Sequence, residues 1–165
     1  MSLLRLVLMG VSGSGKSSVG EALSALINVR YHDGDHLHPP ANVAKMAAGI
    51  PLNDDDRWPW LDRIARMLHD EAPLIIGCSA LRRSYRDRIR AGAGGPVRFV
   101  HLTGSREVLM QRMAVRQGHY MPASLLDSQI ATLEPPGPDE GAFDVDIEQP
   151  VTEIAARIAA QIQEG

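Results

Sequence analysis

Lysine, cysteine and long hydrophobic runs are scarce in this sequence, and each shortage excludes a class of protein. Only Lys16 and Lys45 are lysines among 17 basic residues, and Met46 follows Lys45, so the N-K-x-D motif of a guanine-specific switch is absent. The single cysteine, Cys78, excludes an internal disulfide and fits a reducing cytosol, which predicts a cytoplasmic protein. No apolar run approaches the roughly 20 residues of a membrane-spanning helix. The net charge of −3 provides no basic excess for nucleic acid. We therefore expect neither a membrane nor a nucleic-acid partner.

The order of apolar and amphipathic segments predicts the fold class. The 165 residues are 44% hydrophobic and 22% charged, which is typical of one globular domain spanning 1–165. Short apolar runs alternate with segments of helical periodicity. We expect strands at 3–9, 29–32, 74–77, 97–102 and 144–147, and helices at 16–27, 41–48, 60–71, 81–91, 106–117, 124–133 and after 150. This alternation predicts a three-layer α/β fold, with a parallel sheet covered by helices on both faces. The loops after the first three strands should then meet in one crevice.

Residues 10–18, GVSGSGKSS, fit the phosphate-loop pattern G-x-x-x-x-G-K-[ST]. A predicted strand precedes the loop and a predicted helix follows it, which is the context that the motif requires. Backbone N–H groups and the helix N-terminus would bind phosphate oxygens. Lys16 would hold the β and γ phosphates, and the Ser17 hydroxyl would ligate Mg²⁺. The sequence therefore predicts a nucleoside triphosphate and Mg²⁺ site made of Gly10, Val11, Ser12, Gly13, Ser14, Gly15, Lys16 and Ser17.

Two arginines follow on a later predicted helix. Arg112 and Arg116 are four residues apart, so they share one helix face. Arginines are expected to close over the charge of a transferring phosphoryl group. The break at 117–122 would serve as the hinge of a mobile lid around 112–125. Spacing alone favours the simpler alternative, in which both arginines are solvated.

Polar residues after the second and third predicted strands are candidates for the phosphoryl acceptor. Asp33 and Asp35 flank Gly34, and a carboxylate there can orient a hydroxyl, accept its proton or contact water around Mg²⁺. The pair suits a polyol, although an Asp-Gly turn with exposed charges explains it equally well. The acidic run 54–56 is typical of a helix N-terminus, whereas Arg57 can bind a carboxylate with two hydrogen bonds. Further candidates near the third strand are Ser79, Arg82 and Arg86.

Taken together, these segments resemble the gluconate kinase (gluconokinase) family, in order, over nearly the whole chain. The segments between 33 and 60 and between 78 and 86 are far more specific than the phosphate loop. This sequence has arginine at position 82 where many relatives have lysine, and Tyr120 where phenylalanine is common. The resemblance is carried by the glycine loop, 33–35 with 37–39, 51–57 with 59–61, 78–81 with 85–87, Arg116 with 118–119, and 146–147 with 149–150.

The resemblance implies a nucleoside-monophosphate-kinase-like fold of the P-loop nucleoside-triphosphate hydrolase class. It also implies ATP-dependent phosphorylation of D-gluconate at its terminal hydroxyl, which yields 6-phosphogluconate and ADP, and a homodimer. Catalysis would rest on Lys16, Asp33 and Arg116. The sugar acid would lie near Asp33, Asp35, His38 and Arg57, with Ser79, Arg82 and Arg86 as further contacts, and ATP near Arg112, Arg116, Gln149 and Pro150.

Three alternatives accompany this reading. Shikimate kinase has a similar frame, but that family would be expected to carry a glycine triplet at 78–80, where this chain has Cys-Ser-Ala. A nucleotide-dependent switch would need no acceptor site. A kinase acting on a nucleotide would need a pocket for a base, whereas the paired aspartates favour hydroxyl groups.

Overall fold

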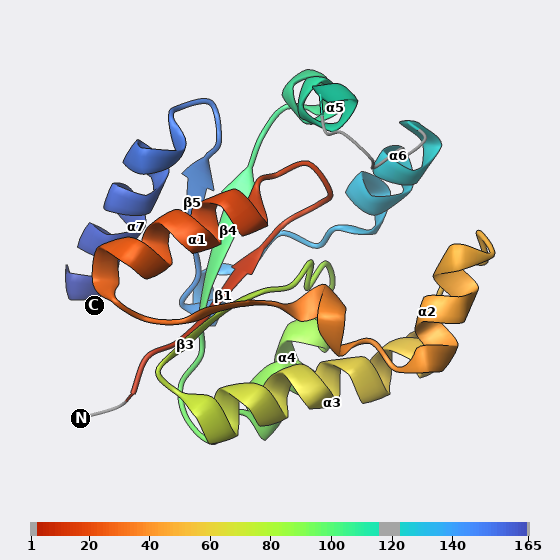
Figure 1. Cartoon of the computed structure of the whole chain (residues 1–165), viewed down its shortest axis with the longest axis horizontal. Helices are drawn as coiled ribbons and strands as arrows, with labels where there is room; N and C mark the ends of the chain where they lie inside the picture. The colour runs from red at the N-terminus through yellow and green to blue at the C-terminus, as the bar shows by residue number, and fades with distance from the viewer. Residues whose placement is uncertain (1–2, 116–122, 165) are drawn as a thin grey trace.

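The chain folds around one parallel sheet, seen in a computed structural model that describes residues 3–115 and 123–164 (Figure 1). Its five strands run in the order β2-β3-β1-β4-β5, and every neighbouring pair is parallel. The predicted α/β class is therefore confirmed. The strands are β1 (Arg5–Met9), β2 (Tyr31–Asp33), β3 (Leu74–Gly77), β4 (Arg98–Thr103) and β5 (Phe143–Asp146).

Helices cover both faces of the sheet, as Figure 1 shows. On one face lie α1 and α7, and on the other lie α3 and α4. None of the helices within 3–115 and 123–164 combines the length and the apolar character that crossing a bilayer requires. The helices are α1 (Lys16–Ile27), α2 (Pro40–Ala47), α3 (Asp54–Glu71), α4 (Arg83–Gly92), α5 (Arg106–Val115), α6 (Ala123–Thr132) and α7 (Val151–Glu164), with short 3₁₀ turns η1 (Gly34–Leu37) and η2 (Pro138–Glu140).

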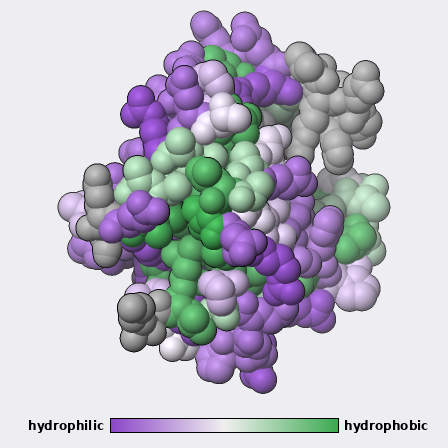
Figure 2. Space-filling view, turned by 60° about the vertical axis from the view of Figure 1, so that its left-hand side comes forward, coloured by the Kyte–Doolittle hydropathy of each residue, from purple (hydrophilic) through white to green (hydrophobic). Residues whose placement is uncertain are grey.

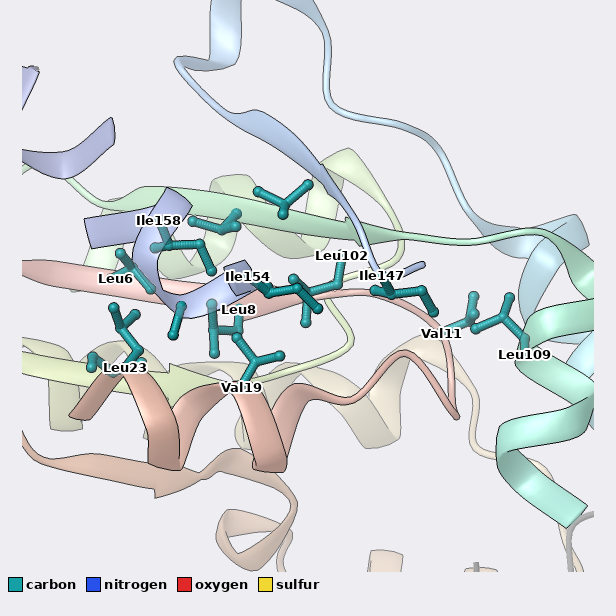
Figure 3. Close-up of a cluster of buried hydrophobic side chains, with 14 of the residues drawn as sticks. Leu6, Leu8, Val11, Val19, Leu23, Leu102, Leu109, Ile147, Ile154 and Ile158 are labelled. Carbon is teal, nitrogen blue, oxygen red and sulfur yellow. The ribbon is translucent and has the colours of Figure 1, made fainter. Parts of the chain in front are cut away.

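The central strand β1 supplies both cores. Alternate residues of a strand point to opposite faces, so Leu6 and Leu8 pack beneath α1 and α7 while Val7 and Met9 pack against α3 and α4. Figure 3 shows Leu6 and Leu8 among side chains of the first of these clusters. All four β1 side chains are fully buried, and each such burial is worth roughly 1.5–3 kcal/mol relative to exposure. A sheet covered on both faces explains why the strand reads as one uninterrupted apolar run.

Helix α3 begins at Asp54, six residues before the expected start at 60. The reason is a reciprocal cap: Asp56 N–H donates to Asn53 Oδ1 (2.8 Å), and Asn53 N–H donates to Asp56 Oδ2 (3.0 Å). Pro59 lies inside the helix rather than at its boundary. The expectation that the acidic run 54–56 marks a helix N-terminus is confirmed.

The strand order brings the loops of interest together. Gly77 at the end of β3 pairs with Leu8 of β1 on one side and with Asp33 of β2 on the other. The three strands therefore end at the same edge of the sheet, where the loops that follow them are neighbours. This is the edge at which ligands bind in such sheets.

Candidate active site

A cavity of about 490 Å³ opens at this edge, and we call it the cleft. It brings together three segments that the sequence singles out: the phosphate loop, the acidic residues after β2, and the arginine-bearing helix α5. Its lining residues are Ser12, Gly13, Gly15, Lys16, Ser17, Ser18, Asp33, Asp35, Gln111 and Arg112.

The backbone of the phosphate loop is shaped for an anion. Gly13 and Gly15 adopt φ values of +84° and +90°, a region that favours glycine. A Cβ atom at Gly13 would also lie only 3.0 Å from the Leu109 carbonyl oxygen. Within residues 3–115 and 123–164, the N–H groups of Gly13, Gly15 and Ser17 make no hydrogen bond. Helix α1 starts at Lys16 without an acidic residue in its first turn, so its positive end is not neutralised. These features fit the phosphates of a nucleoside triphosphate.

The Lys16 side chain curls back over its own loop. Its Nζ donates to the carbonyl oxygens of Gly10 (2.9 Å) and Val11 (3.2 Å). The ammonium group is thereby held beside the first residues of the loop, in the cleft. A compact charge in this position suits the β and γ phosphates better than the broad fork of an arginine.

Residues 33–35, which we call the acidic loop, are held against the end of β3. Asp33 Oδ1 accepts the Asp35 N–H (2.9 Å), which caps the η1 turn. A Cβ atom at Gly34 would lie 2.4 Å from the Gly77 carbonyl oxygen, so only glycine permits this close approach. Trp60 Nε1–H donates to the Gly34 carbonyl oxygen (2.9 Å). Trp60, a buried core residue, therefore also positions the two carboxylates.

Arg112 connects the cleft to the loop after β5. Its Nη2 donates to the Ile147 carbonyl oxygen, and the same side chain lines the cleft. Two residues further on, Gln149 Nε2 donates to the Asp146 carbonyl oxygen (2.7 Å). The Pro150 carbonyl oxygen accepts two N–H groups of the first turn of α7. Gln149 and Pro150 thus lie close to the Arg112 contact, although they are not cleft-lining residues. Arg116 and positions 116–122 of the expected lid lie outside the described residues.

Two other candidate residues lie beyond the acidic loop rather than on the cleft wall. His38 stacks on Trp60, with ring centroids 4.1 Å apart, and its Nδ1 accepts from Asn42 Nδ2 (3.1 Å). Burial lowers the pKa of His38, which favours the neutral imidazole. Arg57 donates to the Tyr85 hydroxyl (3.2 Å), and that hydroxyl donates to Asp54 Oδ1 (2.5 Å).

The residues that follow β3 differ in their surroundings. The Ser79 carbonyl oxygen accepts the Gly10 N–H (3.3 Å), so its backbone abuts the phosphate loop. Arg82 is exposed immediately before α4. Cys78 is fully buried, and burial raises the pKa of its thiol to about 12. The thiol is therefore structural, because almost no reactive thiolate exists at neutral pH.

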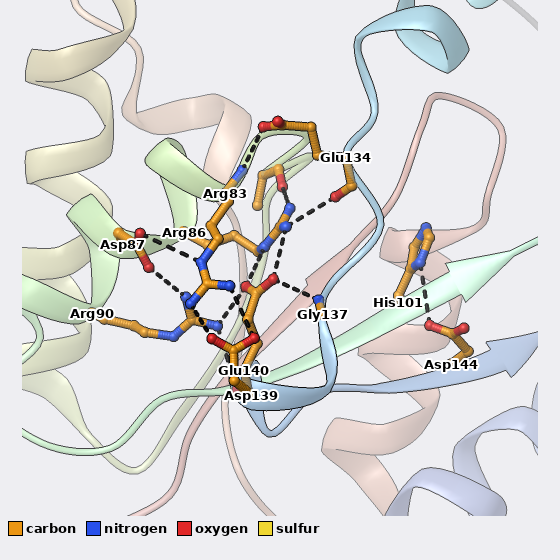
Figure 4. Close-up of polar contacts among 11 residues, drawn as sticks. Arg83, Arg86, Asp87, Arg90, His101, Glu134, Gly137, Asp139, Glu140 and Asp144 are labelled. Atoms are coloured by element: carbon orange, nitrogen blue, oxygen red, sulfur yellow. Dashed lines mark hydrogen bonds and ion pairs between the residues drawn. The ribbon is translucent and has the colours of Figure 1, made fainter.

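Arg86, a predicted substrate contact, requires a correction. Its side chain is fully buried and forms an ion pair with Glu140, Nε to Oε1 at 2.7 Å (Figure 4). It also donates to the carbonyl oxygens of Ala80 (2.8 Å) and Glu134 (2.9 Å). Arg86 faces inward beside Tyr85 on α4 instead of facing the cleft. Its donors fasten the 134–140 segment to the body of the protein, which is a structural role.

Comparison with known proteins agrees with this geometry. A family profile described as AAA domain matches residues 6–136. The chain is 49% identical over 139 residues to a gluconokinase of Gluconobacter oxydans, covering 82% of this chain and 78% of the relative. It is 42% identical over 164 residues to the thermoresistant gluconokinase of Escherichia coli, covering 96% and 93%.

Solved structures show the same relationship. A gluconokinase from Sinorhizobium meliloti superposes with a TM-score of 0.86 at 49% identity, covering 97% of this chain and 95% of the other. A shikimate kinase from Bacteroides thetaiotaomicron superposes with a TM-score of 0.71 at 15% identity, covering 98% and 99%. At so low an identity the second likeness shows the fold alone.

Proposed function

This chain belongs to the gluconokinase family, and from that premise we propose that it transfers the γ-phosphoryl group of ATP to the terminal hydroxyl of D-gluconate. The products are 6-phospho-D-gluconate and ADP. The observation that carries this proposal is the cleft itself, in which a phosphate loop and a pair of carboxylates face the same space. A donor site and an acceptor site in one cavity are what phosphoryl transfer to a small molecule requires.

The phosphate loop and its surroundings would bind ATP and Mg²⁺. The loop N–H groups and Lys16 would bind the phosphates, while Arg112 would contribute positive charge. Mg²⁺ binds through few protein ligands and keeps several waters, so the Ser17 hydroxyl would be its protein ligand, and Asp35 in the same cleft would bind those waters. When bound, the ion would neutralise charge on the phosphates. Gln149 and Pro150 would lie at the nucleoside end.

Asp33 would act on the acceptor. Its carboxylate orients the terminal hydroxyl of gluconate and takes the hydroxyl proton as the new oxygen–phosphorus bond forms. The bond between the γ phosphorus and the bridging oxygen breaks, and ADP leaves with that oxygen. Such transfers depend chiefly on positioning and on charge stabilisation. The remaining hydroxyls and the carboxylate of the sugar acid would extend toward Asp35, His38, Arg57, Ser79 and Arg82.

Three further features belong to the same proposal. A lid around 112–125 would bring Arg116 over the phosphates, because Arg112 at its start already lines the cleft. The family resemblance supports a homodimer, and a band of hydrophobic side chains on the face shown in Figure 2 fits such an interface. The single cysteine, Cys78, is buried and forms no disulfide, which is compatible with a cytoplasmic location.

The proposed substrate is tested by its rank among related acceptors. We expect D-gluconate to give the highest kcat/KM in a coupled assay of ADP release, compared with other sugar acids, shikimate and nucleoside monophosphates. Without an acceptor, ADP release should be slow, because no hydroxyl is positioned to receive the γ-phosphoryl group and only water can accept it. A stronger response to shikimate or to a monophosphate would contradict the proposal.

A further inference from the structure

One hydrogen bond connects the phosphate loop to a distant helix. The Ser12 N–H donates to Gln129 Oε1 at 2.7 Å, across 117 residues of sequence. Because the donor is a backbone N–H, the acceptor must be the carboxamide oxygen, which fixes the orientation of the Gln129 side chain. The Nε2–H₂ group is the other half of the same planar carboxamide, and it supplies two donors beside the loop.

Ser12 marks the part of the loop where the terminal phosphate is expected. It lines the cleft, and the carbonyl oxygens of the two preceding loop residues, Gly10 and Val11, hold the Lys16 ammonium group. That ammonium is the group expected to contact the β and γ phosphates. The Gln129 carboxamide, bonded to Ser12, therefore lies beside the part of the loop where the terminal phosphate is expected.

Gln129 is carried by a firmly anchored helix. Leu126, one turn earlier on α6, is fully buried in the core. Just after the helix, Glu134 N–H donates to the Leu81 carbonyl oxygen (2.7 Å), and the Glu134 carbonyl oxygen accepts from Arg86. The contact with Ser12 is thus made from a fixed support, as positioning a reacting group requires.

We propose that Gln129 is a positioning residue for the terminal phosphoryl group. Its Oε1 holds Ser12 and so keeps the first arm of the loop in place, while its two Nε2–H donors are offered to the γ-phosphoryl oxygens. Neutral donors that are fixed before the reaction stabilise charge without reorganising. The inference rests on the proposed function, since it assigns Gln129 to the donor half of that site.

The test compares two nucleotides in the absence of gluconate. We expect Gln129→Leu to weaken binding of a non-hydrolysable ATP analogue with Mg²⁺ about tenfold, the effect of losing one hydrogen bond to a charged group. Gln129→Glu keeps an acceptor for Ser12 but replaces the donors with a negative charge, so it should weaken the analogue further. In Gln129→Glu, which keeps the Ser12 contact, ADP affinity should stay within about twofold, because the diphosphate lacks the group that Gln129 contacts. In Gln129→Leu, which loses that contact, ADP affinity should fall by less than the affinity for the analogue. Isothermal titration calorimetry measures all of these constants.

Matched substitutions at another glutamine provide the control. Gln161 is exposed on α7, so Gln161→Leu and Gln161→Glu should leave both affinities unchanged. If Gln129→Glu bound the analogue with wild-type affinity, Gln129 would only hold Ser12 and would not contact the γ-phosphoryl group, which would overturn the proposal. Equal weakening of ADP and the analogue would overturn it as well, because that result signals general disruption of the loop. A wild-type enzyme that failed to phosphorylate gluconate would refute the proposed function but leave this comparison intact.

Discussion

We expect Asp33→Asn to lower kcat with gluconate by at least about a hundredfold, the lower end of what a general base contributes. The asparagine side chain has the same shape, and its Oδ1 can still accept the Asp35 N–H that now binds Asp33 at 2.9 Å. The acidic loop should therefore keep its conformation. What the variant loses is the negative charge that orients the acceptor hydroxyl and receives its proton.

Nucleotide binding separates this role from a structural one. The affinity of Asp33→Asn for a non-hydrolysable ATP analogue should stay within about threefold of wild type, because the phosphates are held by the loop and Lys16 rather than by Asp33. Asp62→Asn, at an exposed position on α3, is the matched control and should leave kcat unchanged. Near-normal turnover in Asp33→Asn would remove Asp33 from the mechanism, and loss of analogue binding would assign it to the nucleotide site instead.

We expect Glu140→Gln to destabilise the protein by roughly 3–5 kcal/mol, the usual effect of removing one partner from a buried ion pair. Glu140 Oε1 pairs with Arg86 (2.7 Å) and with Arg90 (2.9 Å), and Oε2 accepts the Gly137 N–H (2.8 Å). The Glu140 and Arg86 side chains are 1% and 0% exposed. The variant leaves the Arg86 charge buried without an anion, so urea unfolding at pH 7 should show the loss.

The same pair predicts a pH dependence. Hydrogen bonds from Arg86 lower the pKa of Glu140 from its usual 4.5 to about 2. Because the folded pKa lies below the unfolded one, the stabilisation is complete above pH 4.5 and disappears as the pH falls toward 2. The difference in unfolding free energy between wild type and Glu140→Gln should narrow across that window.

An exposed ion pair of similar geometry provides a comparison for the stability loss expected in Glu140→Gln. Asp62 and Arg88 form a bidentate ion pair, with Nε to Oδ1 at 2.7 Å and Nη2 to Oδ2 at 2.9 Å. Their side chains are 53% and 46% exposed. Asp62→Asn should cost less than about 1 kcal/mol. A loss of that small size in Glu140→Gln, or a difference that does not change with pH, would contradict the structural role assigned to Arg86.

Local patterns in the sequence were sufficient to predict the strand–loop–helix setting of the phosphate loop and the sheet around it. The phosphate loop, α1 and Asp33 at the end of β2 are all encoded by neighbouring residues, since glycine spacing and apolar periodicity act over short distances. The parallel sheet follows from the alternation of elements, and the sheet then gathers the loops at one edge. The early start of α3 also had a local signal, the Asn53 and Asp56 cap, which the later apolar pattern from Trp60 obscures.

Contacts between distant residues could not be predicted in this way. Arginine recurs every four residues at positions 82, 86 and 90, a spacing typical of a solvated helix face. Arg86 is nevertheless buried, because the fold brings it against Glu140, which lies 54 residues further along the chain. The hydrogen bond from Trp60 to Gly34 and the one from Ser12 to Gln129 likewise exist only once the sheet has formed. Nothing adjacent to Gln129 in the sequence indicates a partner in the phosphate loop.

The central claim is that ATP and gluconate meet in the cleft with the terminal hydroxyl facing the γ phosphorus. A crystal structure with a non-hydrolysable ATP analogue, Mg²⁺ and D-gluconate tests it most directly. We expect the terminal hydroxyl oxygen within about 3–3.5 Å of the γ phosphorus, the spacing of reactants poised for transfer, and hydrogen-bonded to Asp33. A sugar acid bound with its carboxylate toward the phosphates, or with that hydroxyl outside the cleft, would contradict the account.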